Sequence, residues 1–132
     1  MQYQLNLPLS VWVSRRLRFY LNMNEYRNTH YQILNVAKQQ FCLQMTAEIK
    51  AAGIKPMPAA VISYDFFAPD RRRRDLLNVI SVVDKFALDA LVSAEILPDD
   101  NVYRVQYGTI RFAGIDKENP RVVMTITKED LC

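Results

Sequence analysis

The stretch APDRRRRDLLN, residues 68–78, contains four consecutive arginines: Arg71, Arg72, Arg73 and Arg74. Neighbouring like charges repel one another, so a stable fold gains nothing from such a run. Guanidinium groups, however, bind phosphate oxygens through paired, charge-assisted hydrogen bonds. The run therefore predicts a phosphate-binding segment, and the alternative is an ordinary solvated loop. A second basic segment, which contains Arg15, Arg16 and Arg18, would support phosphate binding by the arginine run.

Carboxylates follow the arginine run. Asp75 ends the run, and Asp99 and Asp100 follow the next apolar segment. Mg²⁺ takes oxygen ligands, and a bound metal ion activates water and stabilises charge on a phosphate that is being cut. These aspartates therefore predict metal-assisted phosphodiester cleavage if they come together. Two plainer roles stay open, because Asp75 could only cap a helix and the pair after Pro98 could only form a turn.

The charge of the chain is unevenly distributed. Residues 1–74 hold 11 Lys/Arg and 4 Asp/Glu, a formal charge of +7. Residues 75–132 hold 6 Lys/Arg and 10 Asp/Glu, a formal charge of −4, and the whole chain carries +3. This asymmetry predicts a basic surface beside an acidic one. Nucleic acid is the commonest partner of a basic surface, and divalent cations bind clustered carboxylates.

Hydrophobic periodicity predicts the elements that must position these residues. Strands are expected at 2–7, 59–67, 101–112 and 121–127. One helix is expected from an N-cap at Thr29, with Gln32 in capping-box spacing, to a C-cap at Gly53, and a second over residues 76–94. Residues 14–28 form a basic, aromatic and irregular stretch.

The order β-α-β-α-β-β predicts an α/β (α+β) fold in a single domain, residues 1–132, with a mixed sheet of about four strands packed with two helices. A helix of roughly 19 residues is nearly 30 Å long. Asp75 and Asp100, at its two ends, would meet only if the loop 68–78 ran back along the sheet or if the helix were shorter.

The segments PDRRRRDLLN and DALVSAEILPDDN together resemble the RusA family of Holliday-junction resolvases from phages and prophages. The resemblance is strongest over residues 60 to 105. It lies in an arginine run that leads into Asp-x-x-Asn, followed by a helix that contains a lysine and then by Asp-Asp. It implies a homodimer that binds four-way DNA junctions and cuts phosphodiester bonds with Mg²⁺, in recombination and repair in the cytoplasm of a bacterial host.

Carried over to this chain, the resemblance assigns catalytic roles to Asp75, Asp100 and Lys85 and metal binding to Asp75, Asp99 and Asp100. The arginines of both basic segments and Asn78 would bind DNA. The lysine match is loose, because its spacing from Asn78 differs from that of the family. A bland interpretation of Lys85 is a surface lysine on the polar side of its helix.

One position departs from the family pattern. Leu77 stands where the family has a second catalytic aspartate, and leucine offers no oxygen to a hard cation. Extended backbone before a helix would point residues 75 and 77 the same way, so both side chains could face one ion. Asp65 or Asp89 could compensate in the metal site. The resemblance therefore implies either an active resolvase or a catalytically impaired relative that binds branched DNA or a protein partner without cutting. The charge asymmetry argues against a third alternative, a structural α/β protein with no DNA role.

Composition argues against a membrane protein, a disulfide-rich secreted protein and a zinc protein. The absence of a long apolar run argues against a membrane span, and residues 1–10 lack the features of a signal peptide. The two cysteines, Cys42 and Cys132, do not suggest a disulfide framework, and a single histidine, His30, makes a zinc site improbable. A reducing, intracellular setting is expected. Aromatic residues near the start of the chain are expected in the core or in a dimer interface, namely Trp12, Tyr20 and Tyr26.

Overall fold

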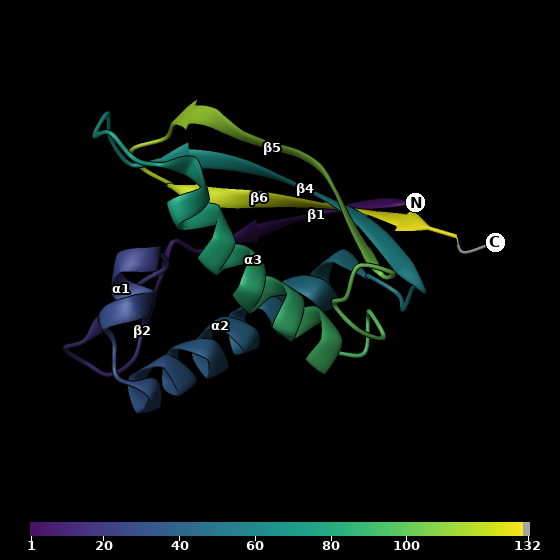
Figure 1. Ribbon diagram of the computed structural model, residues 1–132, viewed down its shortest axis with the longest axis horizontal. Coiled ribbons are helices and arrows are strands. Elements are labelled where there is room, and N and C mark those ends of the chain that lie inside the picture. Colours follow the sequence, from purple (N-terminus) through teal and green to yellow (C-terminus); the bar gives the residue numbers. More distant parts are fainter. Residues whose placement is uncertain (131–132) are drawn as a thin grey trace.

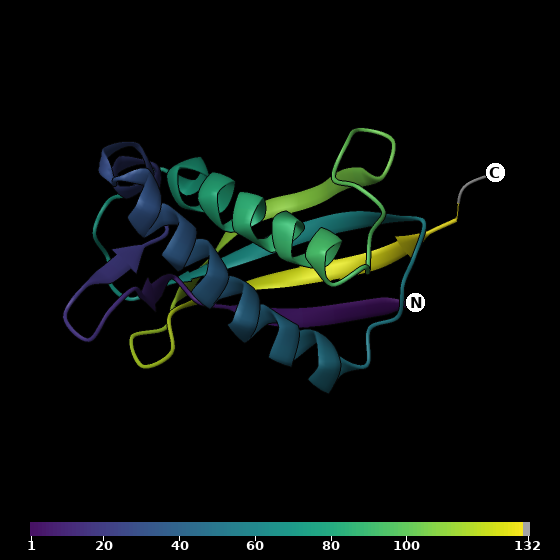
Figure 2. The same cartoon turned by 90° about the horizontal axis from the view of Figure 1, so that it is seen from below.

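The computed structural model describes residues 1–130 and places one mixed four-stranded sheet against two long helices (Figure 1). The strands of this sheet are β1 (Gln2–Leu7), β4 (Ala59–Ala68), β5 (Val105–Ile115) and β6 (Arg121–Glu129). The long helices are α2 (Tyr31–Ala52) and α3 (Leu76–Ser93). They lie side by side across the same face of the sheet (Figure 2). The predicted α/β class and the four-stranded mixed sheet are confirmed.

The strand order in the sheet is β1-β6-β4-β5, and only the β4–β5 pair is parallel. The segment β4-α3-β5 is therefore a crossover unit, in which α3 returns the chain to the end of the sheet where β4 began. The end of β5 lies beside the end of β4, because the amide of Asp116 donates to the carbonyl of Ala68 at 2.8 Å. The arginine run lies in the loop between β4 and α3, so the crossover fixes this loop at one end of the sheet.

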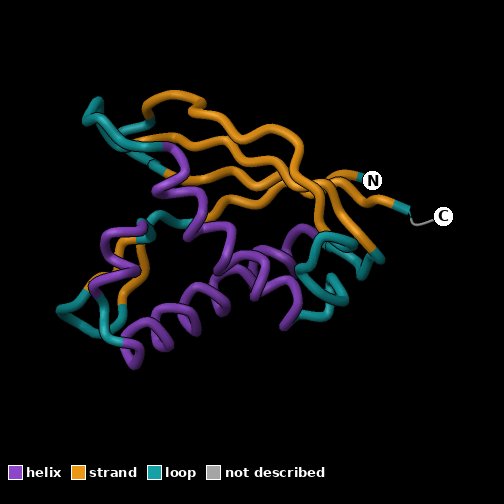
Figure 3. The backbone as a smooth tube through the Cα atoms, viewed as in Figure 1, coloured by secondary structure: helices purple, strands orange, loops and turns teal. Residues whose placement is uncertain are grey.

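The irregular stretch predicted near the start of the chain is ordered instead. It forms β3 (Arg18–Tyr20) and α1 (Met23–Asn28), and β3 pairs with β2 (Ser10–Trp12), which precedes the stretch, as a separate antiparallel hairpin (Figure 3). The prediction missed the hairpin because strands of three residues are too short to establish a period-2 pattern. Both strands bury only their middle residue, Val11 in β2 and Phe19 in β3.

Helix α2 begins one residue later than predicted. Its N-cap is His30, whose Nδ1 accepts from the amide of Gln32 at 3.2 Å. Thr29 instead ends α1, where its hydroxyl donates to the carbonyl of Glu25 at 2.5 Å. The predicted C-cap is confirmed, because Gly53 adopts the left-handed conformation with φ of 66°.

The core lies between the sheet and the two helices. The sheet contributes the inward-facing residues of β4, such as Ile62, Tyr64 and Phe66, and α2 contributes the stripe that includes Phe41 and Met45. Phe86 of α3 joins the layers: its ring centroid lies 5.9 Å from that of Phe19, 5.7 Å from that of Phe41 and 6.4 Å from that of Tyr26.

Within residues 1–130, the structure contains no helix of sufficient length and apolar character to cross a membrane. Cys42 is half-buried in α2, and Cys132 lies outside the described residues.

Candidate nucleic-acid interface

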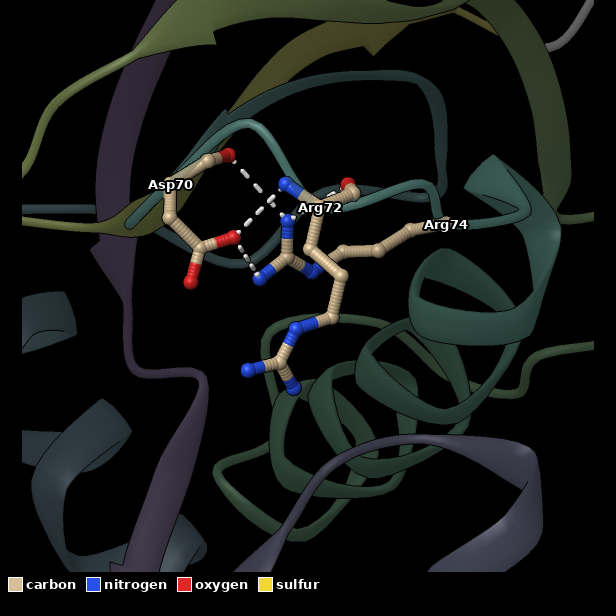
Figure 4. A network of polar contacts seen from close by, with 3 residues as sticks. All are labelled: Asp70, Arg72 and Arg74. Atoms are coloured by element: carbon tan, nitrogen blue, oxygen red, sulfur yellow. Dashed lines mark hydrogen bonds and ion pairs between the residues drawn. The ribbon is translucent and has the colours of Figure 1, made fainter.

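The arginine loop is held in shape by the aspartate that precedes it. Asp70 accepts from the amide of Arg72 at 2.9 Å and from the guanidinium of Arg74 at 2.7 Å (Figure 4). Arg74 also donates to the carbonyls of Asp70 and Arg72. The Arg72 amide and the Arg74 guanidinium lower the pKa of the Asp70 carboxyl below its ordinary value. Asp70 and Arg74 therefore serve the loop itself, whereas the guanidinium of Arg72 extends away from them (Figure 4).

A groove of about 580 Å³ joins this loop to the β2–β3 hairpin. Its cationic lining comes from Arg18, Arg72 and Arg74, which lie on two segments far apart in the sequence. A neighbouring hollow shares Tyr20, Asn22, Arg72, Arg74 and Val79 with it and adds Asn78 of α3. The guanidinium groups of Arg18 and Arg72, with several amides beside them, can bind phosphates of a nucleic-acid strand along this groove, and Asp70, which also lines it, is paired with Arg74. We call this surface the arginine groove.

Arg18 is held in a fixed position in the arginine groove. Its Nε donates to the hydroxyl of Ser10 at 2.7 Å, and its guanidinium carbon lies 5.2 Å from the ring centroid of Trp12 and 5.5 Å from that of Tyr20. The sequence placed these two aromatic residues in the core or in a dimer interface. In the chain as described they are on the surface, with 54% of Trp12 and 48% of Tyr20 exposed. Only Tyr26 fits the core part of that prediction, because it is partly buried against Phe86.

The other predicted DNA-binding arginines lie outside the arginine groove. Arg71 lines an adjoining hollow between the loop and β5, which shares Arg72 and Arg74 with the groove and has apolar walls that include Phe66 and Phe112. Arg73 is exposed in the loop. Arg15 and Arg16 are exposed in the turn between β2 and β3, where the Ser14 hydroxyl accepts from the Arg16 amide at 3.4 Å.

The structure does not bring the predicted metal ligands together. Asp75 is the N-cap residue of α3, exposed and without a side-chain capping hydrogen bond. Asp99 and Asp100 follow the other end of the same helix, whose 18 residues span about 27 Å. The loops before and after α3 lie at opposite ends of the molecule (Figure 1). In the described part of the chain, no group of three or more His, Cys, Asp or Glu side chains could hold a metal ion.

The turn interpretation of Asp99 and Asp100 fits the contacts. The carboxylate of Asp99 accepts from the amide of Asp100 at 2.7 Å and from the side-chain amide of Asn101 at 3.2 Å. The predicted strand from residue 101 accordingly begins later, at Val105, after a turn that Arg104 closes by donating to the carbonyl of Asn101 at 3.0 Å.

The proposed compensating carboxylates and the helix lysine join no metal-binding group among the described residues. Asp65 faces away from the helices, because it alternates with the buried Tyr64, and its carboxylate pairs with Arg111 of β5. Asp89 is exposed on α3. Lys85 faces α1, where its ammonium lies 5.7 Å from the ring centroid of Tyr26.

Sequence patterns did not single out Asp84, a half-buried aspartate of α3 that lies between two tyrosine hydroxyls. Its two carboxylate oxygens accept hydrogen bonds from the hydroxyls of Tyr64 and Tyr107, each at 2.5 Å. Burial raises the pKa of the Asp84 carboxyl above its ordinary value against the effect of these hydrogen bonds, and the charge of Asp100 raises it further. Burial and the charge of Asp84 raise the pKa of Tyr64 in turn. The available signal was helical spacing, since Asp84 follows Ile80 by one turn and adjoins the apolar stripe.

Leu77 lies in the first turn of α3, with 62% of the residue exposed. The expectation that residues 75 and 77 share one direction is wrong, because helical backbone begins at Leu76 and residues two apart on a helix do not face each other. An aspartate at position 77 would still lie at the same end of α3 as Asp75 and the arginine loop.

No family model matches the chain, and no curated protein matches it significantly. The likeness to the RusA family accordingly rests on the motif residues alone.

Proposed function

We propose that this protein binds four-way DNA junctions and cuts them as a Mg²⁺-dependent endonuclease of the RusA type. The observation that carries the DNA-binding part is the arginine groove, where Arg18, Arg72 and Arg74 converge from two segments of the chain. The motif resemblance supports the choice of junctions and the cleavage step. A resolvase of phage or prophage origin would act in recombination and repair in the cytoplasm of a bacterial host.

Within the groove the arginines have different tasks. Arg74 is partly covered and makes its hydrogen bonds inside the loop. Arg72 is exposed and its guanidinium points away from Asp70 and Arg74, so it is the better phosphate ligand (Figure 4). Loss of Arg72 should weaken binding to DNA of every sequence, because phosphate contacts carry no base information.

Cleavage on this proposal requires two copies of the chain. Asp75 and Asp100 lie beyond opposite ends of α3, so one copy cannot direct both at one Mg²⁺ ion. β5 runs from the Asp100 end of α3 to the arginine loop, and it is an edge strand that pairs only with β4 among the described residues. Two-fold pairing of β5 with β5 of a second copy would be antiparallel. It would set the Asp100 end of each copy beside the Asp75 end of the other.

Two features of β5 support a homodimer of this kind. Its exposed large apolar side chains are Tyr107, Phe112 and Ile115. An open strand edge with exposed apolar side chains favours addition of another strand. The pairing would also bring the acidic turn of one copy toward the arginine loop of the other, so the opposite charges of the two ends would attract. Lys85, on α3 facing α1, would stay outside such a shared site.

A second candidate function is junction binding without cleavage, by a relative that has lost the nuclease step. The observation that favours it is Leu77, an exposed apolar residue in the turn of α3 that follows Asp75. A site with a leucine there has one carboxylate fewer for a cation that requires oxygen ligands.

The test is a binding and cleavage assay on a synthetic four-way junction and on linear duplex of the same length, with and without Mg²⁺. We expect tighter binding to the junction, cleavage only with Mg²⁺, and weaker binding by Arg72→Ala with a smaller salt dependence. Lys55→Ala is the matched control, because it removes an exposed positive charge near the start of β4, away from the groove. Equal affinity for junction and duplex, unchanged by Arg72→Ala, would contradict the proposal.

A further inference from the structure

The β2–β3 hairpin has one buried and one open face. Val11 and Phe19 are buried side by side against the core and anchor the ribbon. The register pairs Trp12 with Arg18 and Ser10 with Tyr20, so these four side chains share the opposite face. Two large aromatic residues on this open face leave about half of their surface in solvent. We call the row formed by Trp12, Arg18 and Tyr20 the aromatic row.

The aromatic row is held in place. The guanidinium of Arg18 lies near both rings, within 5.5 Å of each centroid, and its Nε is bonded to Ser10. Within the described residues, no carboxylate forms an ion pair with Arg18. The row therefore presents flat aromatic surface next to an uncompensated positive charge, with side-chain freedom already restricted. Such preorganisation lowers the entropic cost of binding a flat ligand.

The aromatic row borders the arginine groove. Arg18 and Tyr20 line the groove together with Arg72, so a strand whose phosphates follow these guanidinium groups passes beside the Tyr20 ring. Trp12 does not line the groove itself, but its ring lies on the other side of Arg18 in the same row. The faces of unpaired nucleobases stack on exposed aromatic side chains in many single-strand binding sites. In a duplex the bases are already stacked on each other and their faces are not accessible.

We propose that the aromatic row is a stacking site for unpaired nucleobases of a bound nucleic-acid strand. The proposal rests on nucleic-acid binding by the arginine groove. It adds a reason for structural selectivity, because a single-stranded end, or a junction that is opened at its centre, offers base faces that the interior of a linear duplex does not. Trp12 and Tyr20 carry the stacking, and Arg18 joins them to the phosphate path.

Trp12 is the only tryptophan of the chain, so its fluorescence reports directly on this site. The probe is a single-stranded oligothymidylate of 12 nucleotides, and the comparison ligand is a long blunt-ended duplex, in which all bases are paired and nearly all base faces are stacked. We expect the single strand to quench Trp12 fluorescence strongly and the duplex to quench it weakly. Binding constants would be measured separately, by anisotropy of a labelled oligonucleotide.

The variants distinguish the contribution of aromatic stacking to single-strand affinity from the contribution of charge. Trp12→Ala and Tyr20→Ala should each weaken single-strand binding roughly 5- to 100-fold, whereas Trp12→Phe should retain most of the affinity. Tyr31→Ala is the control, because Tyr31 is an exposed aromatic residue at the start of α2, outside the groove. Circular dichroism would check that each variant is folded.

Two negative outcomes are distinguishable. Binding that depends on Arg72 but leaves Trp12 fluorescence unchanged and tolerates Trp12→Ala overturns the stacking site alone. Equal quenching by the duplex also overturns it, since a duplex has no free base faces. Absence of binding to every DNA overturns both the stacking site and the proposed function.

Discussion

Asp75 lies at the N-terminus of α3, whereas Asp100 follows its C-terminus and lies close enough to Asp84, nine residues along the chain from Asp75, for its charge to raise the pKa of Asp84. In the proposed dimer, a metal site that uses both Asp75 and Asp100 is built from two copies of the chain.

We expect complementation between two inactive variants, Asp75→Asn and Asp100→Asn. Each variant alone lacks one ligand at every site, so neither should cut a junction in the presence of Mg²⁺. In a mixed dimer one of the two sites contains both native aspartates. A refolded equal mixture should therefore recover activity at about a quarter of the sites. The measurement is strand cleavage of an end-labelled junction on a denaturing gel.

The control for complementation is a mixture of Asp75→Asn with itself, refolded in the same way. Recovery in the mixed sample supports a shared site. An Asp75→Asn protein that cuts as fast as the native chain would show that Asp75 is no ligand, and a dimeric but inactive mixture would contradict sharing between subunits.

Leu77→Asp should increase Mg²⁺-dependent cleavage, because it adds a hard oxygen ligand at the Asp75 end of α3. Metal-free stability should change by less than about 0.5 kcal/mol, since the position is exposed and the helix N-terminus offsets repulsion from Asp75. Leu43→Asp is the matched control, as Leu43 is an equally exposed helical leucine. Equal cleavage rates in the native chain and Leu77→Asp would exclude residue 77 from the metal site.

Asp84→Asn should change how stability depends on pH. Burial raises the pKa of Asp84 in the folded chain, so the folded state holds this proton more tightly than the unfolded state. The resulting stabilisation is present below the ordinary aspartate pKa and is lost as pH rises through the folded-state value. Chemical denaturation of both proteins from pH 3 to 7 should show the native chain losing stability relative to Asp84→Asn as pH increases. Parallel stability curves would contradict a raised pKa.

Phe86→Ala should be among the most destabilising single substitutions. The Phe86 ring is 2% exposed and contacts aromatic rings of β3, α1 and α2, so its removal leaves a cavity where four elements meet. We expect a loss of about 3–5 kcal/mol in the free energy of unfolding. Tyr103→Ala, at an exposed turn position, should cost less than about 0.5 kcal/mol. Urea denaturation measures both, and a loss below 1 kcal/mol for Phe86→Ala would contradict the central role of this ring.

Local sequence patterns were sufficient for the main elements. The alternation in AAVISYDFF and the apolar spacing of α2 and α3 predicted the sheet strands and the helices, because one-sided burial imposes a period on the sequence. The sequence did not predict the β2–β3 hairpin, because its strands of three residues are too short to show a periodic pattern. Trp12 and Tyr20 of this hairpin were expected in the core or in a dimer interface; the core part is wrong because both are exposed in the described chain, and the dimer part stays a prediction.

What the sequence determined by itself is the chemistry that is present: an arginine run bounded by aspartates, a basic first half, an acidic second half and a leucine at position 77. Only the tertiary structure decided which of these groups meet. Arg18 and Arg72 line one groove because the β2–β3 hairpin lies beside the arginine loop. Asp84 contacts Tyr64 and Tyr107 because α3 packs across β4 and β5. Asp75 and Asp100 stay apart because a continuous helix is a rigid spacer. Motif spacing counts residues along the chain, whereas distance in space depends on the length and direction of the element between them.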